Sequence, residues 1–237
     1  MMLSPGIIGY SSMVRFYIPH ALFVWLSAVC AYVFVTGKLS VKSRLAVVVL
    51  GMGCAAMATH LQVTTSIAAL IVTVWAGMVF AVWLVRCDRQ QFKWAMLWML
   101  LVLVIAVPAF WFGLQASGYG AHLIEKFQTP RLWSLTTRSD YRYFHRYFAE
   151  TYPMLWAGFA FAAIVALARR PGPAWFCLVF FGLAFVIHSC LPFKAPRYLV
   201  YAWPFFFLVW AIALDGLLAW LVSQGRVAVG HVFGESF

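Results

Sequence analysis

Apolar residues dominate the chain in long runs that short polar stretches interrupt. Seven such segments lie at about 16–36, 45–58, 66–85, 94–113, 153–168, 174–190 and 198–222. A helix needs roughly 20 apolar residues to cross a bilayer, and most of the runs approach that length. The second has only about 14 residues, so it is tilted, re-entrant, or extended through Thr59 and His60. The pattern predicts an all-α, polytopic transmembrane bundle of about seven membrane segments, forming a single membrane domain over residues 1–237.

The composition agrees with a membrane class and excludes an ordinary soluble domain. Of 237 residues, 65% are hydrophobic and 10% are charged, and the mean hydropathy is +0.90. The net charge of +11 comes from basic residues dispersed between the apolar runs, not from the cluster that a nucleic-acid footprint requires. We therefore expect membrane lipids as partners and no nucleic acid.

Positive charges alternate between the connections. Basic residues follow the first, third and fifth segments: Lys38, Lys42, Arg44; Arg86, Arg89, Lys93; and Arg169, Arg170. The connection between the second and third segments has none. The positive-inside rule then puts these basic connections in the cytoplasm, the amino terminus of this chain outside and the carboxyl terminus inside, in a plasma (inner) membrane. The loop at about 114–152 lies outside.

The amino terminus begins outside and lacks the charged start of a signal peptide. It reads like the tail of a loop between helices. We expect the chain to be the later part of a longer membrane protein.

The stretch HSCLPFKAPRYLVYAWPFFF (188–207) places two basic residues on the outer side, against the charge rule. Its prolines prevent helix continuation, so the chain turns and gathers His188, Lys194, Arg197 and Tyr198 at the membrane rim. One interpretation is that the basic side chains extend to lipid headgroups. The other is an anion site, with lysine as a point charge and arginine as a fork for phosphate oxygens. The apolar wall that follows suits an isoprenoid tail.

Three motifs carry a family resemblance. The first is Lys194-Ala-Pro-Arg197-Tyr198 followed by Pro204 within an apolar helix, and the others are VRFYIPHALFVWLSAVCAYVF (14–34) and YRYFHRYFAETYPMLW (141–156). In order and spacing they resemble GT-C-type membrane glycosyltransferases, the superfamily of dolichyl-phosphate-mannose protein mannosyltransferases and bacterial aminoarabinose lipid A transferases. The resemblance implies transfer of a sugar from a polyprenyl-phosphate donor, at the outer face, to a lipid, protein or glycan acceptor.

The resemblance also implies roles for the basic residues. Lys194 and Arg197, with Tyr198, hold the carrier phosphate and stabilise it as it leaves. His188 either orients the phosphate or hydrogen-bonds a neighbouring helix. Arg15, with Tyr17, either joins this pocket or anchors the first segment at the interface.

The family's catalytic carboxylate lies in a first outer loop that no part of this chain matches. The transfer needs a carboxylate to take a proton or hold a divalent metal. Among the six acidic residues, three fall in the outer loop: Glu125, Asp140 and Glu150. Each has a local alternative, since Glu125 precedes Lys126, Asp140 lies between Arg138 and Arg142, and Glu150 is four residues after Arg146. Asp215 lies within the last segment, near its cytoplasmic side, where it is either functional or hydrated.

The outer loop itself has two interpretations. Its aromatic residues at Tyr141–Phe148 fall at helical spacing and predict a helix lying flat on the outer surface. That helix either closes over the donor and acceptor or anchors the loop. Two other functions fit the same basic rim: a non-enzymatic translocase of polyprenyl lipids, and an inactive fragment or assembly subunit.

Overall fold

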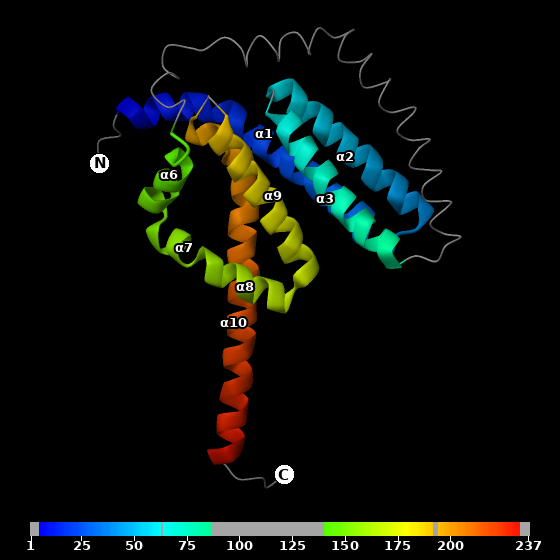
Figure 1. Ribbon diagram of the computed structural model, residues 1–237, viewed down its shortest axis with the longest axis vertical. Coiled ribbons are helices and arrows are strands. Elements are labelled where there is room, and N and C mark those ends of the chain that lie inside the picture. The colour runs from blue at the N-terminus through cyan, green and yellow to red at the C-terminus, as the bar shows by residue number, and fades with distance from the viewer. Residues whose placement is uncertain (1–4, 63, 87–139, 192–193, 233–237) are drawn as a thin grey trace.

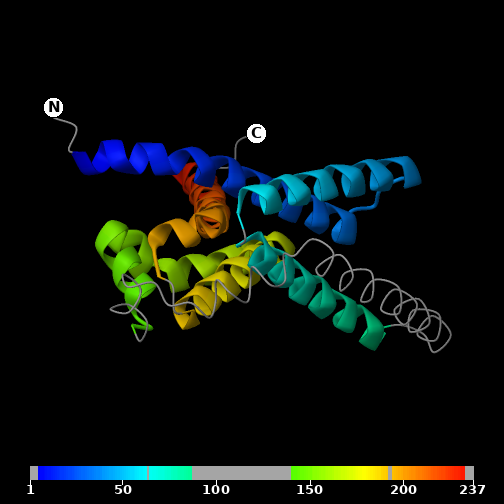
Figure 2. The ribbon, with the colours of Figure 1, turned by 90° about the horizontal axis from the view of Figure 1, so that it is seen from above.

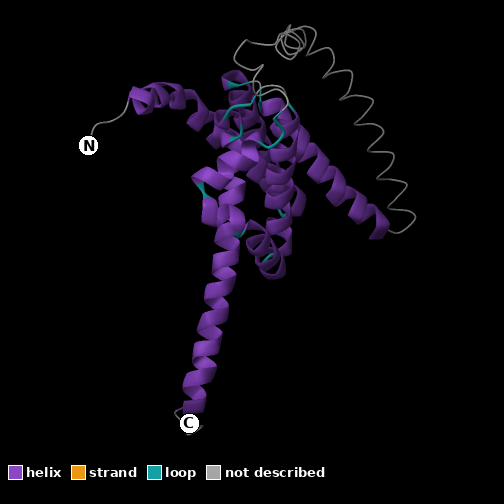
Figure 3. Cartoon of the chain, turned by 60° about the vertical axis from the view of Figure 1, so that its left-hand side comes forward, coloured by secondary structure: helices purple, strands orange, loops and turns teal. Residues whose placement is uncertain are grey.

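The computed structural model describes residues 5–62, 64–86, 140–191 and 194–232. The regular secondary structure within these ranges is all helical, and turns and loops connect the helices (Figures 1 and 3). The long helices are α1 (Pro5–Thr36), α2 (Val41–Leu61), α3 (Thr65–Arg86), α9 (Pro171–Cys190) and α10 (Trp203–Val232). The short ones are α6 (Tyr143–Thr151), α7 (Pro153–Ala157) and α8 (Phe159–Arg169), and two 3₁₀ turns, η2 (Pro196–Tyr198) and η3 (Val200–Ala202), precede α10.

Five of the described helical regions are long and apolar enough to cross a membrane. They are Tyr17–Thr36, Val41–Leu61, Thr65–Leu84, Pro171–Cys190 and Val200–Gln224. Their many exposed leucine, valine and methionine side chains suit a lipid environment, because the hydrocarbon solvates apolar surface that water would not. The protein is therefore membrane-embedded, and the part of it that the structure describes is all-helical.

The helix boundaries differ from the expected seven segments in two places. The run at 45–58 lies within α2, which has 21 residues and needs no re-entrant turn. The run at 153–168 is divided into α7 and α8, so it does not form one long helix. The run at 94–113 lies outside the described residues. Five long apolar helices are thus established, and the expected seven are not.

The break between α7 and α8 has a packing reason. Gly158 caps α8, and a Cβ atom added there would lie 2.9 Å from Cη2 of Trp210 on α10. Only a residue without a side chain allows the bent backbone to approach the indole this closely. The bend lets α8 pack on α10, although the apolar pattern alone is that of one continuous span.

The helices form two connected groups. α1 packs along α2 in one group, and α10 packs against α8 and α9 in the other (Figures 1 and 2). α1 reaches the second group through η3, and α3 does so through α9. Aromatic pairs fill these contacts: the ring centroids of Phe180 and Phe205 lie 3.9 Å apart, and those of Trp75 and Phe176 4.7 Å apart. The far end of α10 projects beyond the other helices (Figures 1 and 3).

Contacts between distant segments show which connections share an end of the bundle. Tyr32, near the end of α1, lies 5.1 Å (ring centroids) from Phe176, near the start of α9. The basic α1–α2 connection and the Arg169–Arg170 connection therefore lie toward one end. Farther from that end, Nε2 of His20 in α1 lies 2.9 Å from Oγ1 of Thr65, which begins α3 directly after the uncharged α2–α3 turn. The two basic connections thus lie together, as the charge pattern predicts, while the absolute orientation in a membrane stays a prediction.

Candidate functional site

The segment between α9 and α10 buries its lysine. Lys194 is only 3% exposed, and its Nζ lies 5.0 Å from the ring centroid of Tyr141. Burial lowers the pKa of Lys194, and the nearby charges of Asp140 and Cys190 oppose that shift. This enclosed position differs from that of a lysine extended into lipid headgroups, because the ammonium group is packed against the ring of Tyr141, just before α6.

Asp140 joins the lysine to α6. Its Oδ1 accepts a hydrogen bond from the backbone N–H of Arg142 at 3.1 Å, and its Oδ2 forms an ion pair with Arg146. The expected Arg146–Glu150 pair is wrong within the described residues, because Arg146 turns back to Asp140 and Glu150 is exposed. Of the candidate carboxylates that the structure describes, Asp140 is the one whose charge acts on Lys194, a predicted phosphate-binding residue.

α6 presents two faces, as the aromatic spacing predicts. Phe144 and Phe148 are fully buried on one face, while Arg146 and Glu150 lie on the exposed face. Phe148 packs against Phe181 and Phe206, with ring centroids 5.6 and 5.2 Å away. The helix is therefore fixed to α9 and α10 by its apolar side chains, and it carries Asp140 at its start.

Arg197 faces a different group of residues. Its Cζ lies 5.3 Å from the ring centroid of Tyr198. The side chains of Arg197 and Tyr198 both act electrostatically on the hydroxyl of Tyr17 in α1. All three side chains are partly exposed. The structure therefore brings Lys194 toward the α6 side and Arg197 toward the α1 side of the same short segment.

His188 lies beneath this segment. It is 1% exposed, and its Nε2 is 3.0 Å from the hydroxyl of Tyr201, which is also 1% exposed. Its Nδ1 has no hydrogen-bond partner within the part of the chain that the structure describes. The observed contact is the one expected of a histidine that joins two helices, and the phosphate-orienting role stays a prediction.

A second buried histidine was not predicted. His20 of α1 is 2% exposed, and its Nε2 lies 2.9 Å from Oγ1 of Thr65 at the start of α3. Its ring meets that of Tyr201 edge to face, with centroids 5.9 Å apart. The available signal was a histidine after Pro19 inside an apolar run, because such a residue needs a polar partner from another helix.

Other predicted residues lie apart from this cluster. Glu125 lies outside the described residues, and the side chain of Arg15 is not among those that the structure describes. Across the described ranges, no three His, Cys, Asp or Glu side chains gather as ligands for the divalent metal considered above.

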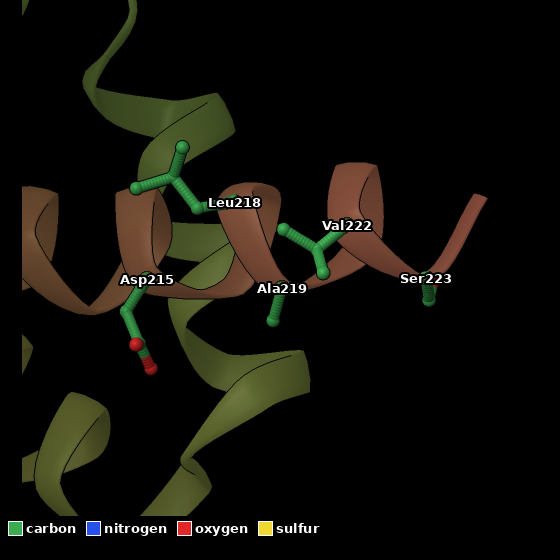
Figure 4. A pocket seen from close by; sticks show the side chains of 5 residues that line it. All are labelled: Asp215, Leu218, Ala219, Val222 and Ser223. Atoms are coloured by element: carbon green, nitrogen blue, oxygen red, sulfur yellow. The ribbon is translucent and has the colours of Figure 1, made fainter. Parts of the chain in front are cut away.

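Asp215 lies toward the other end of the bundle. Its Oδ2 is 3.2 Å from Nη2 of Arg170 and 3.9 Å from Nε of Arg169. The carboxylate borders an open groove on α10 whose other lining residues are Leu218, Ala219, Val222 and Ser223 (Figure 4). These ion pairs join the α8–α9 connection to α10, which accounts for a carboxylate inside an apolar segment.

Comparison with known proteins finds no matching family model, no matching curated protein and no matching solved structure. The class defined here is that of a multi-helix membrane protein with a polar cluster at one end. The residues of that cluster carry the functional argument.

Proposed function

We propose that the chain is a membrane glycosyltransferase, or its C-terminal part, that uses a polyprenyl-phosphate-linked sugar at the outer face. The observation that carries the proposal is the cluster around residues 194–198. It combines the buried Lys194, which packs against the Tyr141 ring and feels the charge of Asp140, with Arg197 against the Tyr198 ring. The neighbouring helices are apolar enough to lie in lipid. A prenyl phosphate has the same two parts, an anionic head and a long apolar tail.

The proposed chemistry assigns each charged group a role. Arg197 and Lys194 bind the phosphate oxygens of the donor and stabilise the negative charge that develops as the sugar–phosphate bond breaks. The phosphate leaves with the electron pair of that bond. An acceptor hydroxyl or amine attacks the anomeric carbon, and Asp140 takes its proton. The burial of Lys194 supports this role, since a charge interaction is stronger where water is excluded.

Transfer is tested with the full chain in proteoliposomes. The vesicles receive a panel of polyprenyl-phosphate sugars together with lipid, peptide and glycan acceptors, and release of polyprenyl phosphate is followed by mass spectrometry. We expect the Lys194→Ala, Arg197→Ala double variant to lose at least a hundredfold in release while it keeps the wild-type helical circular dichroism. Wild-type activity in that double variant would exclude the proposal.

The alternative function is a translocase, which the same cluster favours because carrier recognition needs no base. It predicts movement of a fluorescent polyprenyl phosphate between leaflets without sugar release. Under that alternative, Asp140→Asn leaves movement unchanged. Under the transferase proposal, the same variant abolishes release and retains carrier binding.

A further inference from the structure

Lys194 lies beneath a side chain that is itself exposed. The residue is 3% exposed, and its Nζ lies 5.0 Å from the ring centroid of Tyr141, which is 65% exposed. Since the two groups are in contact and the ring is the one that meets solvent, the ring lies on the solvent side of the ammonium group. A phosphate that arrives from solvent therefore meets Tyr141 before it meets Lys194.

The contact between the ring and the ammonium group is attractive but can be exchanged for a stronger one. The face of an aromatic ring attracts a cation, and such a contact favours the paired state by about twofold to thirtyfold. Phosphate oxygens accept charge-assisted hydrogen bonds from a lysine ammonium, which has three N–H donors. An anionic headgroup can therefore displace the ring, and the lost ring contact then reduces its apparent affinity.

The backbone that carries Tyr141 is held on both sides of this residue. Oδ1 of Asp140 accepts a hydrogen bond from the N–H of Arg142 at 3.1 Å, and the backbone carbonyl of Asp140 accepts one from the N–H of Tyr143 at 3.2 Å. Phe144, which is fully buried, fixes the start of α6. Rotation about the side-chain bonds of Tyr141 moves the ring without moving this backbone. Exposed side chains change rotamer within nanoseconds, so the ring can turn away without any rearrangement of the helices.

We propose that Tyr141 is a gate over Lys194: its ring and an anionic headgroup compete for the ammonium group, and the ring turns outward when the headgroup binds. The inference rests on the proposed function for the identity of that headgroup, and it adds a regulating residue to the same site. The gate is one side chain, because α6 itself is fixed to α9 and α10 by Phe144 and Phe148.

The first arm of the test measures the accessibility of Lys194 and needs no ligand. The purified full chain is treated briefly with a water-soluble acetylating ester, and the acetylation of each lysine is followed by mass spectrometry. The rate at Lys194 follows the fraction of molecules whose ring is turned away, so we expect Tyr141→Ala to raise it about twofold to thirtyfold. Tyr141→Phe keeps the ring and should react at the wild-type rate. Lys38 and Lys42, which are exposed, are internal references whose rates should not change.

The variants are expected to fold, because a ring that is mostly exposed leaves no core cavity when it is removed. Wild-type helical circular dichroism checks this for Tyr141→Ala. Tyr141→Gln also removes the ring and replaces the alanine variant in both arms should that variant fail to fold.

The second arm measures equilibrium binding of farnesyl phosphate to the same proteins, with farnesol as the probe that lacks phosphate. Removal of the competing ring makes every molecule competent to bind, which raises the apparent affinity by the same factor as the accessibility. We expect Tyr141→Ala to bind farnesyl phosphate about twofold to thirtyfold more tightly and farnesol with unchanged affinity. Tyr141→Phe should match the wild type with both probes.

The outcomes separate the gate from the proposed function. Equal acetylation of Lys194 in the wild type and in Tyr141→Ala would overturn the gate, even where the wild type prefers farnesyl phosphate to farnesol. Faster acetylation without a gain in farnesyl phosphate affinity would overturn the competition between ring and headgroup. Should the wild type and Tyr141→Ala both bind farnesyl phosphate no better than farnesol, the phosphate site fails, and the proposed function and the gate fail together.

Discussion

At the scale of single residues, the buried lysine gives a pH signature. Burial lowers the pKa of Lys194 below its ordinary value of 10.5. Phosphate binding needs the charged form, so we expect farnesyl phosphate affinity to fall as the pH rises through this lowered pKa. Lys194→Arg keeps its charge across the alkaline range, and its affinity should stay level where that of the wild type falls. Parallel binding curves for the two proteins from pH 7 to 10 would argue against a charged Lys194 at the phosphate.

The lowered pKa of Lys194 affects protein stability in the opposite direction from ligand affinity as the pH rises. Between the lowered pKa and 10.5, Lys194 is neutral in the folded state and charged in the unfolded state. The unfolded state then binds more protons, so this group's contribution to stability rises with pH in that window. Ligand affinity and intrinsic stability therefore change in opposite directions, which distinguishes titration of Lys194 from general alkaline unfolding.

The pair of His188 and Tyr201 predicts a stability effect. Tyr201→Phe leaves Nε2 of the buried His188 without its partner, and we expect a loss of about 1–3 kcal/mol in the free energy of unfolding. The double variant His188→Leu, Tyr201→Phe removes both polar groups. It should be less destabilised than the sum of the two single variants. Thermal unfolding of the four proteins in one detergent measures this cycle, and additive losses would show that the two groups do not interact.

At the scale of the elements, the bend between α7 and α8 depends on one glycine. Gly158→Ala puts a Cβ 2.9 Å from the Trp210 ring, so we expect overpacking to cost about 1–3 kcal/mol. Gly53→Ala in α2 is the control, because nothing lies within 4 Å of its added Cβ and alanine favours a helix. The melting temperature should fall for the first variant and stay or rise for the second. Equal effects would mean that the close contact with Trp210 is relieved at no cost.

The apolar pattern predicts where helices occur, but it does not predict where a helix breaks. Helices at 16–36, 66–85, 174–190 and 198–222 were predicted because a bilayer requires long apolar runs, and the structure has a helix in each place. The break at Gly158 depends on Trp210, about fifty residues away, which periodicity does not record.

The charged residues of the candidate site could be predicted from the sequence, but the residues that they contact could not. Lys194 and Arg197 were identified because they oppose the charge rule. Their separation toward α6 and α1 depends on tertiary packing, and so does the choice of Asp140 by Arg146 over the local Glu150. The pairing of His20 with Thr65 was not predicted either, because a polar turn gives no sign of which helix it meets.

At the scale of the whole molecule, two of the basic connections share one end of the bundle, and this predicts an orientation. Arg169 and Arg170 lie at the end shared with the α1–α2 connection, whereas Cys190 ends α9 at the other end and is exposed. Positive-inside sorting puts the arginine end in the cytoplasm. We expect a membrane-impermeant maleimide added to intact cells to label Cys190 when the other four cysteines are replaced by alanine.

Ser40→Cys provides the matched position for this experiment. Ser40 is exposed in the α1–α2 connection, so in a background without the five native cysteines it should react only after the membrane is opened. The chain changes sides of the bilayer each time an α-helix crosses it. Labelling of Ser40→Cys in intact cells, together with protection of Cys190, would therefore show that the topology is the inverse of the predicted one. Lys194, Arg197 and Tyr17 would then face the cytoplasm. A transferase acting there would need a donor presented on the inner leaflet, and the outer-face reaction proposed above would be excluded.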